Sequence, residues 1–89
     1  MGYIVKISRQ VEKGLPKLPA NVRHRLSVLV GYLEIDGPAG GVYFQNYSKL
    51  SDTEYHCHLT YHYVACWRFE KKTILIEVYY AGTHEKAPY

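Results

Sequence analysis

The sequence predicts an α+β fold in which two N-terminal helices pack on one face of a mostly antiparallel sheet, in the order β-α-α-β-β-β-β. Three observations predict it. A β-branched, alternating segment opens the chain, an amphipathic stretch leads to a glycine-rich stop, and the rest has the two-residue period of strands. With 89 residues, 47% hydrophobic and 21% charged, the chain suits a single globular domain over positions 1–89.

The first half of the sequence predicts one strand and two helices. Residues 3–8 alternate and are β-branched, which is typical of a strand. Residues 9–17 favour a short helix, and Pro19 suits the first turn of a second helix that continues to about Asp36. The glycine-rich residues 37–41 then end this helix. Its apolar positions keep a three-to-four spacing and predict one buried stripe: Val22, Leu26, Leu29, Val30 and Leu33.

The second half of the sequence predicts strands alone. They span residues 42–50, 54–60, 63–69 and 73–81. The links between the later strands are short and polar, as in hairpins, so these strands are expected to run antiparallel. The helices must cover one face of the sheet, which leaves the other face free to bind a ligand.

A pair of histidines in the 54–60 strand marks the free face. Because side chains alternate across a strand, His56 and His58 share one face, and the apolar Tyr55, Cys57 and Leu59 share the other. Two imidazoles on an open sheet face can bind anions, transfer protons or hold a metal. The pattern alone also allows a purely structural role for them.

A metal site would need more ligands than this pair supplies. Catalytic zinc usually has three protein ligands, so the third would have to be His62 or His84. No acidic residue nearby completes the set, and Cys57 points to the other face. We therefore expect no metal and no other cofactor.

Basic and aromatic residues elsewhere could join the histidines. Residues 82–89 carry His84, Lys86 and Tyr89, which offer a proton carrier, a cation and an aromatic hydroxyl, although terminal residues commonly fray. Arg68 would lie on the free face if Tyr63, Ala65, Trp67 and Phe69 form the buried side of their strand. There it could clamp a phosphate, or simply point to water.

Composition indicates the kind of partner, the state of the cysteines and the compartment to expect. The net charge of +3 permits a polyanionic partner without requiring one. Cys57 and Cys66 are expected to be free buried thiols, because two cysteines do not make the disulfide framework of a small secreted domain. The sequence shows neither a secretory leader nor an apolar run of bilayer length, so we expect a cytoplasmic protein that does not contact membranes.

The element order and several local segments resemble the RelE/ParE-type toxins of bacterial toxin–antitoxin systems over nearly the full length. The segments are Asn-Tyr-Ser-Lys-Leu at 46–50, Tyr-His-Cys-His-Leu at 55–59, Gly-Thr-His-Glu-Lys-Ala-Pro-Tyr at 82–89, and the Lys-Leu-Pro link at 17–19. They are most similar to a RelE-like subgroup. The resemblance implies a metal-independent endoribonuclease that cleaves mRNA on the ribosome and is held inactive by a cognate antitoxin. Operator DNA would be bound only by the toxin–antitoxin complex.

The resemblance also implies roles for particular residues. His56 and His58 occupy the positions of two outward basic catalytic residues, His84 matches a basic residue after the last strand, and Tyr89 matches a terminal aromatic that contacts the cleaved nucleotide. His62-Tyr63-Val64 stands where the family usually has an arginine. Candidate contacts to RNA or phosphate are Arg68, Lys86, His62 and Lys49.

Metal-free RNA cleavage is consistent with these side chains. The 2′-hydroxyl attacks the adjacent phosphate, which requires a base, an acid and cations, and imidazole can serve in either proton-transfer role near neutral pH. We assign His58 as the base and His84 or Tyr89 as the acid, with His56 and either Lys86 or Arg68 holding the phosphate. The alternatives are a ParE-like gyrase poison, an inactive module that binds an antitoxin and represses its operon, and a metal-dependent enzyme.

Overall fold

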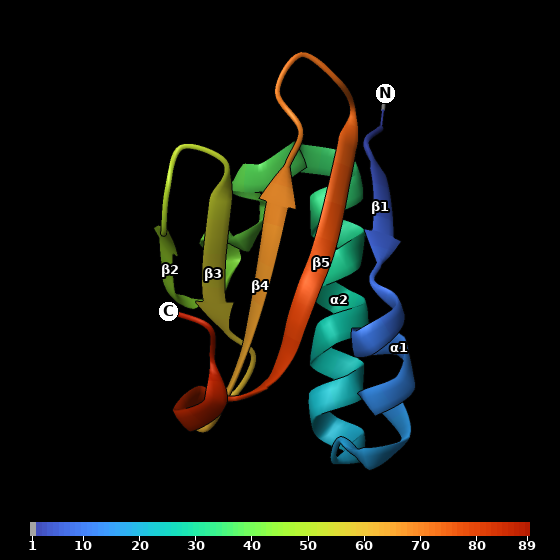
Figure 1. The fold of residues 1–89 in the computed structure, drawn as a ribbon, viewed down its shortest axis with the longest axis vertical. Helices are drawn as coiled ribbons and strands as arrows, with labels where there is room; N and C mark the ends of the chain where they lie inside the picture. Colours follow the sequence, from blue (N-terminus) through green and yellow to red (C-terminus); the bar gives the residue numbers. More distant parts are fainter. Residues whose placement is uncertain (1) are drawn as a thin grey trace.

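A computed structural model describes residues 2–89 and contains a five-stranded sheet with two α-helices (Figure 1). The elements are β1 (Ile4–Ile7), α1 (Arg9–Gly14), α2 (Ala20–Asp36), β2 (Gln45–Lys49), β3 (Glu54–His58), β4 (Tyr63–Phe69) and β5 (Leu75–Thr83), with 3₁₀ segments at Leu15–Lys17, Gly37–Tyr43 and His84–Lys86. The strand order is β1-β5-β4-β3-β2, with β1 parallel to β5 and all other pairs antiparallel. The expected α+β fold is confirmed.

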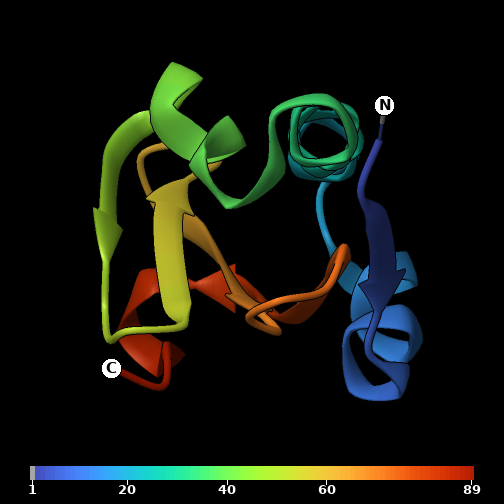
Figure 2. The same ribbon diagram turned by 90° about the horizontal axis from the view of Figure 1, so that it is seen from above.

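Helix α2 covers one face of the sheet, and the C-terminal tail lies on the other face (Figure 2). Four of the five predicted stripe residues of α2 are buried, namely Val22, Leu26, Leu29 and Leu33, whereas Val30 is half-buried. Gly37 ends the helix with a φ of 78° and donates its N–H to the Leu33 carbonyl. Only glycine adopts such a backbone at little cost, so the predicted stop is confirmed.

Several predicted boundaries were wrong, among them that of the strand expected over 54–60, which ends at His58. The helix expected over residues 9–17 changes to a 3₁₀ turn at Leu15, just before Pro16, which cannot donate a backbone hydrogen bond. The strand expected from position 42 begins only at Gln45, because Gly37–Tyr43 forms a 3₁₀ segment over the sheet. The last strand is displaced towards the C-terminus and ends at Thr83, two residues into the expected tail.

Trp67 is the central side chain of the core and is completely buried. Its ring stacks in parallel with Tyr55 and Tyr47, with centroids 6.1 and 6.2 Å away. Its indole N–H donates a hydrogen bond of 3.1 Å to the Pro38 carbonyl, which satisfies the polar group of a buried tryptophan. Trp67 therefore fastens the 3₁₀ segment Gly37–Tyr43 to the sheet.

Gly41→Ala tests this packing. A Cβ at Gly41 would lie 2.7 Å from Trp67 Cζ2 and 2.8 Å from Tyr47 Cδ1, closer than real contacts allow. Overpacking of this kind costs about 1–3 kcal/mol in free energy of unfolding, measurable by chemical denaturation. Gly14→Ala is the matched control: a Cβ there meets nothing within 4 Å, so we expect no loss of stability. Equal stability of the two variants would contradict the assigned role of Trp67.

Candidate functional site

The pairing of β3 with β4 determines where the two strand histidines point. Cys57 pairs with Ala65, and both belong to the core beneath α2. His56 pairs with Cys66 and His58 with Val64, so the histidines lie on the opposite face, as alternation predicted. This open face carries the tail in Figure 2.

The tail is folded onto the open face and is not frayed. The Tyr80 hydroxyl donates a 2.7 Å hydrogen bond to the Thr83 carbonyl, and the His84 backbone N–H donates one of 2.8 Å to the His62 carbonyl. The chain then makes the 3₁₀ turn His84–Lys86 and returns along the sheet. Its last residue, Tyr89, places its ring 4.5 Å from that of His56.

The result is a cluster of four rings, His56, His58, His84 and Tyr89, which we call the His–Tyr cluster. The ring centroids of His58 and His84 are 5.1 Å apart, those of His56 and His58 6.1 Å, and those of His84 and Tyr89 6.0 Å. All four catalytic candidates are thus brought together from β3 and the tail. Two imidazoles at this separation can contact one substrate group from two sides.

His56 differs from the other two imidazoles because it is buried. Only 9% of its surface is exposed, and its Nδ1 lies 3.0 Å from Ser48 Oγ. Burial lowers the pKa of His56, the Ser48 contact opposes this shift, and the nearby His58 and His84 lower it further. A neutral His56 does not supply charge to a phosphate, so it can hold one only through a hydrogen bond from its ring.

Tyr89 and the buried thiols keep their protons. Burial is the main cause that raises the pKa of Tyr89, so its hydroxyl is available as a hydrogen-bond donor. Burial also raises the pKa of Cys66, which lies under the cluster, and of Cys57 to about 12 each. Both cysteines are free and buried, as predicted, and neither is a thiolate nucleophile near neutral pH.

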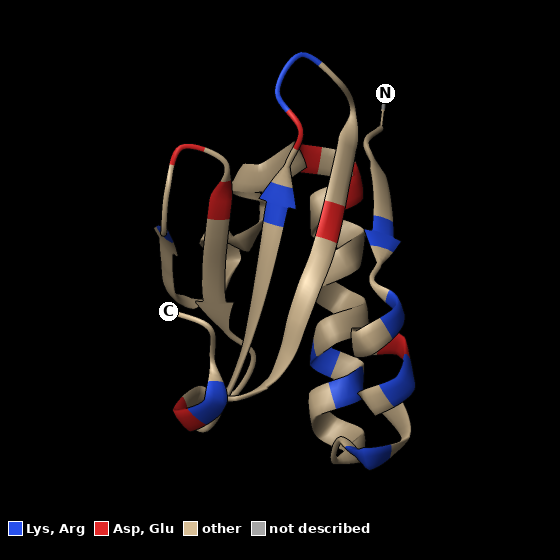
Figure 3. Cartoon of the chain, viewed as in Figure 1, with Lys and Arg blue, Asp and Glu red and all other residues tan. Residues whose placement is uncertain are grey.

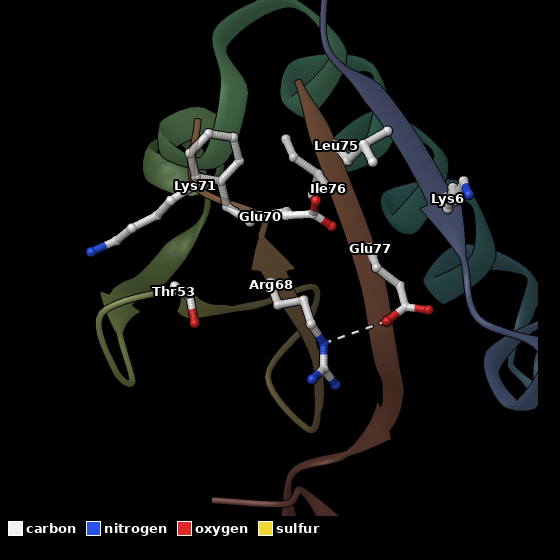
Figure 4. A pocket seen from close by; sticks show the side chains of 9 residues that line it. Lys6, Thr53, Arg68, Glu70, Lys71, Leu75, Ile76 and Glu77 are labelled. Atoms are coloured by element: carbon white, nitrogen blue, oxygen red, sulfur yellow. Dashed lines mark ion pairs between the residues drawn. The ribbon is translucent and has the colours of Figure 1, made fainter. Parts of the chain in front are cut away.

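Arg68 lies on the open face, but it already has partners. Its guanidinium is 4.1 Å from the centre of the Tyr79 ring, and its Nε is 3.4 Å from Glu77 Oε1 (Figure 4). Arg68, Tyr79 and Lys86 line one surface hollow of about 650 Å³ beside the tail. Arg68 and Lys86, two of the predicted phosphate contacts, therefore share one hollow, which the Glu77 carboxylate also lines.

The structure separates Lys49 from the other candidates. Lys49 pairs with Tyr55 and lies 5.8 Å above that ring, on the face that packs under α2. His62 belongs to the loop between β3 and β4, where its ring stands edge-on to Tyr61 at 4.7 Å. It lines a hollow of about 660 Å³ together with His58 and His84. His62 thus joins the site through the loop, and Lys49 does not.

A further hollow of about 490 Å³ lies at the β4–β5 hairpin (Figure 4). Its charged lining residues are Lys6, Arg68, Glu70, Lys71 and Glu77. Because cations and carboxylates are mixed there, their charges largely offset one another. We assign it no ligand.

Sequence reasoning missed two residues that support the site. Ser48 contacts His56 from β2, and this pairing could not be known before the register of β2 was known. Arg25, an exposed residue of α2, donates from its Nε to the Leu59 carbonyl at 2.8 Å. Arg25 holds the beginning of the loop that carries Tyr61 and His62.

Charge is unevenly distributed over the molecule. Figure 3 shows mostly basic residues on α1 and the N-terminal half of α2, at the same end as the tail. Acidic residues are prominent towards the opposite end, at the β2–β3 loop and the end of α2. Within residues 2–89, no group of three or more His, Cys, Asp or Glu is arranged to hold a metal ion, and no helix is long and apolar enough to cross a membrane.

Comparisons with known proteins confirm the resemblance at the level of the fold. A chain of the archaeal RelE–RelB complex from Pyrococcus horikoshii OT3 has a TM-score of 0.77 and 24% identity, over 98% of this chain and 100% of that one. A mutant of the E. coli toxin RelE in the free state has a TM-score of 0.74 and 17% identity, over 98% and 88%. A chain of the YoeB–YefM complex from Staphylococcus aureus has a TM-score of 0.70 and 11% identity, over 94% and 99%. No known family profile and no curated protein sequence matches the chain.

The environment of His56 predicts a pH-dependent stability. Because folding lowers its pKa, the unfolded chain binds the proton more strongly, and stability falls as the pH drops below 6.5, the ordinary value. His56→Gln should reduce this fall between about pH 7.5 and 5.5, followed as the free energy of unfolding. His24→Gln, at an exposed position of α2, should leave the fall unchanged. If the free energy of unfolding of His56→Gln fell with pH as steeply as that of the wild type, His56 would not be the source of the pH dependence.

Proposed function

We propose that this chain is the toxin of a type II toxin–antitoxin system and a metal-independent endoribonuclease that cleaves mRNA on the ribosome, so inhibiting translation in the cytoplasm. The proposal depends chiefly on the 5.1 Å separation of His58 and His84 at the edge of an open hollow. The RelE-like fold supports it, because that fold belongs to proteins described as toxins and found in complexes with RelB or YefM.

The proposed reaction uses the RNA's own 2′-hydroxyl. His58 accepts the proton of this hydroxyl as the O2′–P bond forms, and His84 donates a proton to the 5′-oxygen as the P–O5′ bond breaks. The products are a 2′,3′-cyclic phosphate and a free 5′-hydroxyl, so atoms and charge balance without a metal. The pair suits these roles because both side chains reach the hollow.

Tyr89 and His56 assist without carrying charge. The Tyr89 ring lies 4.5 Å from the ring of His56 and 6.0 Å from that of His84, and its hydroxyl, whose pKa is raised above the ordinary value, can donate a hydrogen bond to a phosphate oxygen. His56 supports the Tyr89 ring from below and is itself held by Ser48. Lys86, which lies in the tail between His84 and Tyr89, supplies a cation that has no carboxylate partner among the described ion pairs.

Two partners follow from the proposal. A ribosome with bound mRNA presents phosphates to the end of the molecule where basic residues gather. A cognate antitoxin would neutralise the toxin by covering or distorting the His–Tyr cluster, and only their complex would bind operator DNA.

Substitution of the proposed acid and base tests the reaction. His58→Ala and His84→Ala should each slow mRNA cleavage on translating ribosomes about a hundred-fold or more, the usual contribution of general acid–base catalysis. His24→Ala on α2 is the control and should cleave like the wild type. Primer extension locates the cuts, and circular dichroism checks the fold. Unchanged cleavage by both cluster variants would rule out this assignment.

Assays of DNA supercoiling by gyrase, of mRNA integrity and of antitoxin binding distinguish the alternative functions. If the wild type blocks DNA supercoiling by gyrase and leaves mRNA intact, the ParE-like alternative is correct. If it inhibits neither process but binds its antitoxin, the chain is an inactive module. Either result would overturn the proposed activity.

Chelation tests whether the reaction needs a transition metal. Because His58 and His84 supply both proton transfers, EDTA should leave cleavage of a purified RNA–ribosome substrate unchanged when Mg²⁺ is added in excess over EDTA, so that the ribosome keeps its free Mg²⁺ while transition metals are removed. Added Zn²⁺ should inhibit, since neutral imidazoles that bind zinc no longer transfer protons. Stimulation by zinc would contradict the proposal.

A further inference from the structure

We infer that Tyr61 is a stacking platform for an unpaired base next to the scissile phosphate. This inference rests on the proposed function and extends it to a residue outside the His–Tyr cluster. Tyr61 is 81% exposed, the highest exposure among the large hydrophobic side chains described. It lies in the loop between β3 and β4, directly after the strand that carries His58.

The position of Tyr61 relative to the proposed acid and base supports this role. Tyr61, His58 and His84 line the same hollow of about 660 Å³. The remaining lining residues are His62, Tyr63, Thr83 and Glu85. A phosphate held between His58 and His84 would therefore have an adjoining base within the same hollow. Glu85 is the one carboxylate there, and it disfavours a second phosphate more than it disfavours a neutral base.

The loop is held in place before any ligand binds. Arg25 donates to the Leu59 carbonyl, and the Leu59 and Thr60 N–H groups both donate to the Tyr63 carbonyl, at 2.8 and 3.2 Å. At the other end, the His62 carbonyl accepts the His84 N–H. A fixed backbone lowers the entropy cost of stacking a base on the loop.

Tyr61 is also braced by its neighbour. The His62 ring meets it edge-on at 4.7 Å and an interplanar angle of 78°. This contact supports the Tyr61 side chain while most of its surface remains available. Aromatic faces that are fixed and exposed stack on any unpaired base, and a base in a duplex cannot reach them without leaving the stack.

Binding and cleavage are to be measured separately. The binding probe is a short single-stranded RNA that contains 2-aminopurine, whose fluorescence falls on stacking, with 2′-O-methyl groups that prevent cleavage. Tyr61→Ala should abolish the fluorescence loss and weaken binding about ten-fold, within the range that base–aromatic stacking gives. Tyr61→Phe should behave like the wild type because the ring remains. Tyr43→Ala, at a 61% exposed tyrosine beside α2, is the matched control and should change nothing.

The outcomes separate this inference from the proposed function. Wild-type binding by Tyr61→Ala, or absence of any fluorescence loss with the wild type, overturns the stacking site even if mRNA cleavage proceeds. A fluorescence loss that depends on Tyr61 without any mRNA cleavage supports the stacking site and overturns the nuclease. If Tyr61→Ala weakens only the complex with an antitoxin, the loop is a protein contact and the inference is wrong.

Discussion

The burial of Trp67 is the constraint on which the site depends. Once this ring lies under the 3₁₀ segment Gly37–Tyr43, the inward face of β4 is determined, and its pairing with β3 determines the inward face of that strand as well. His56 and His58 must then point to the open face, because the two-residue period allows no other arrangement. A shift of register by one residue would bury both imidazoles beneath α2 and expose Cys57.

The open face has a small buried apolar layer of its own. Val64 and Cys66 are completely buried there, although they do not belong to the core beneath α2. The 3₁₀ turn after β5 and the returning tail, which carry His84 and Tyr89, lie over this face. The same residues thus complete both the packing and the proposed site. A tail with this double role is ordered even without RNA, which explains why a terminal segment contributes to a defined geometry.

The sequence predicted the histidine face because alternation within one strand is a local property. The sequence could not predict the face of Lys49, because β2 contains a bulge. Gln45 pairs with His58 but Ser48 pairs with His56, and Asn46 between them has a φ of 58°. One extra residue reverses the side chains beyond it, which places Ser48 with the histidines and Lys49 with Tyr55. Tertiary hydrogen bonds, such as that from Arg25 to the Leu59 carbonyl, likewise cannot be predicted from a periodic pattern.

An imidazole site imposes an electrostatic condition that a site built from lysine or arginine does not. Three neighbouring imidazoles cannot all be protonated at low cost, and burial already keeps His56 neutral. The cluster can therefore move protons but cannot by itself neutralise the charge of the transition state. In the proposed reaction, that charge would be balanced by Lys86, by the Tyr89 hydroxyl and by the basic end of the molecule. Since Arg68 is paired with Glu77, any recruitment of its guanidinium to RNA first requires this ion pair to open.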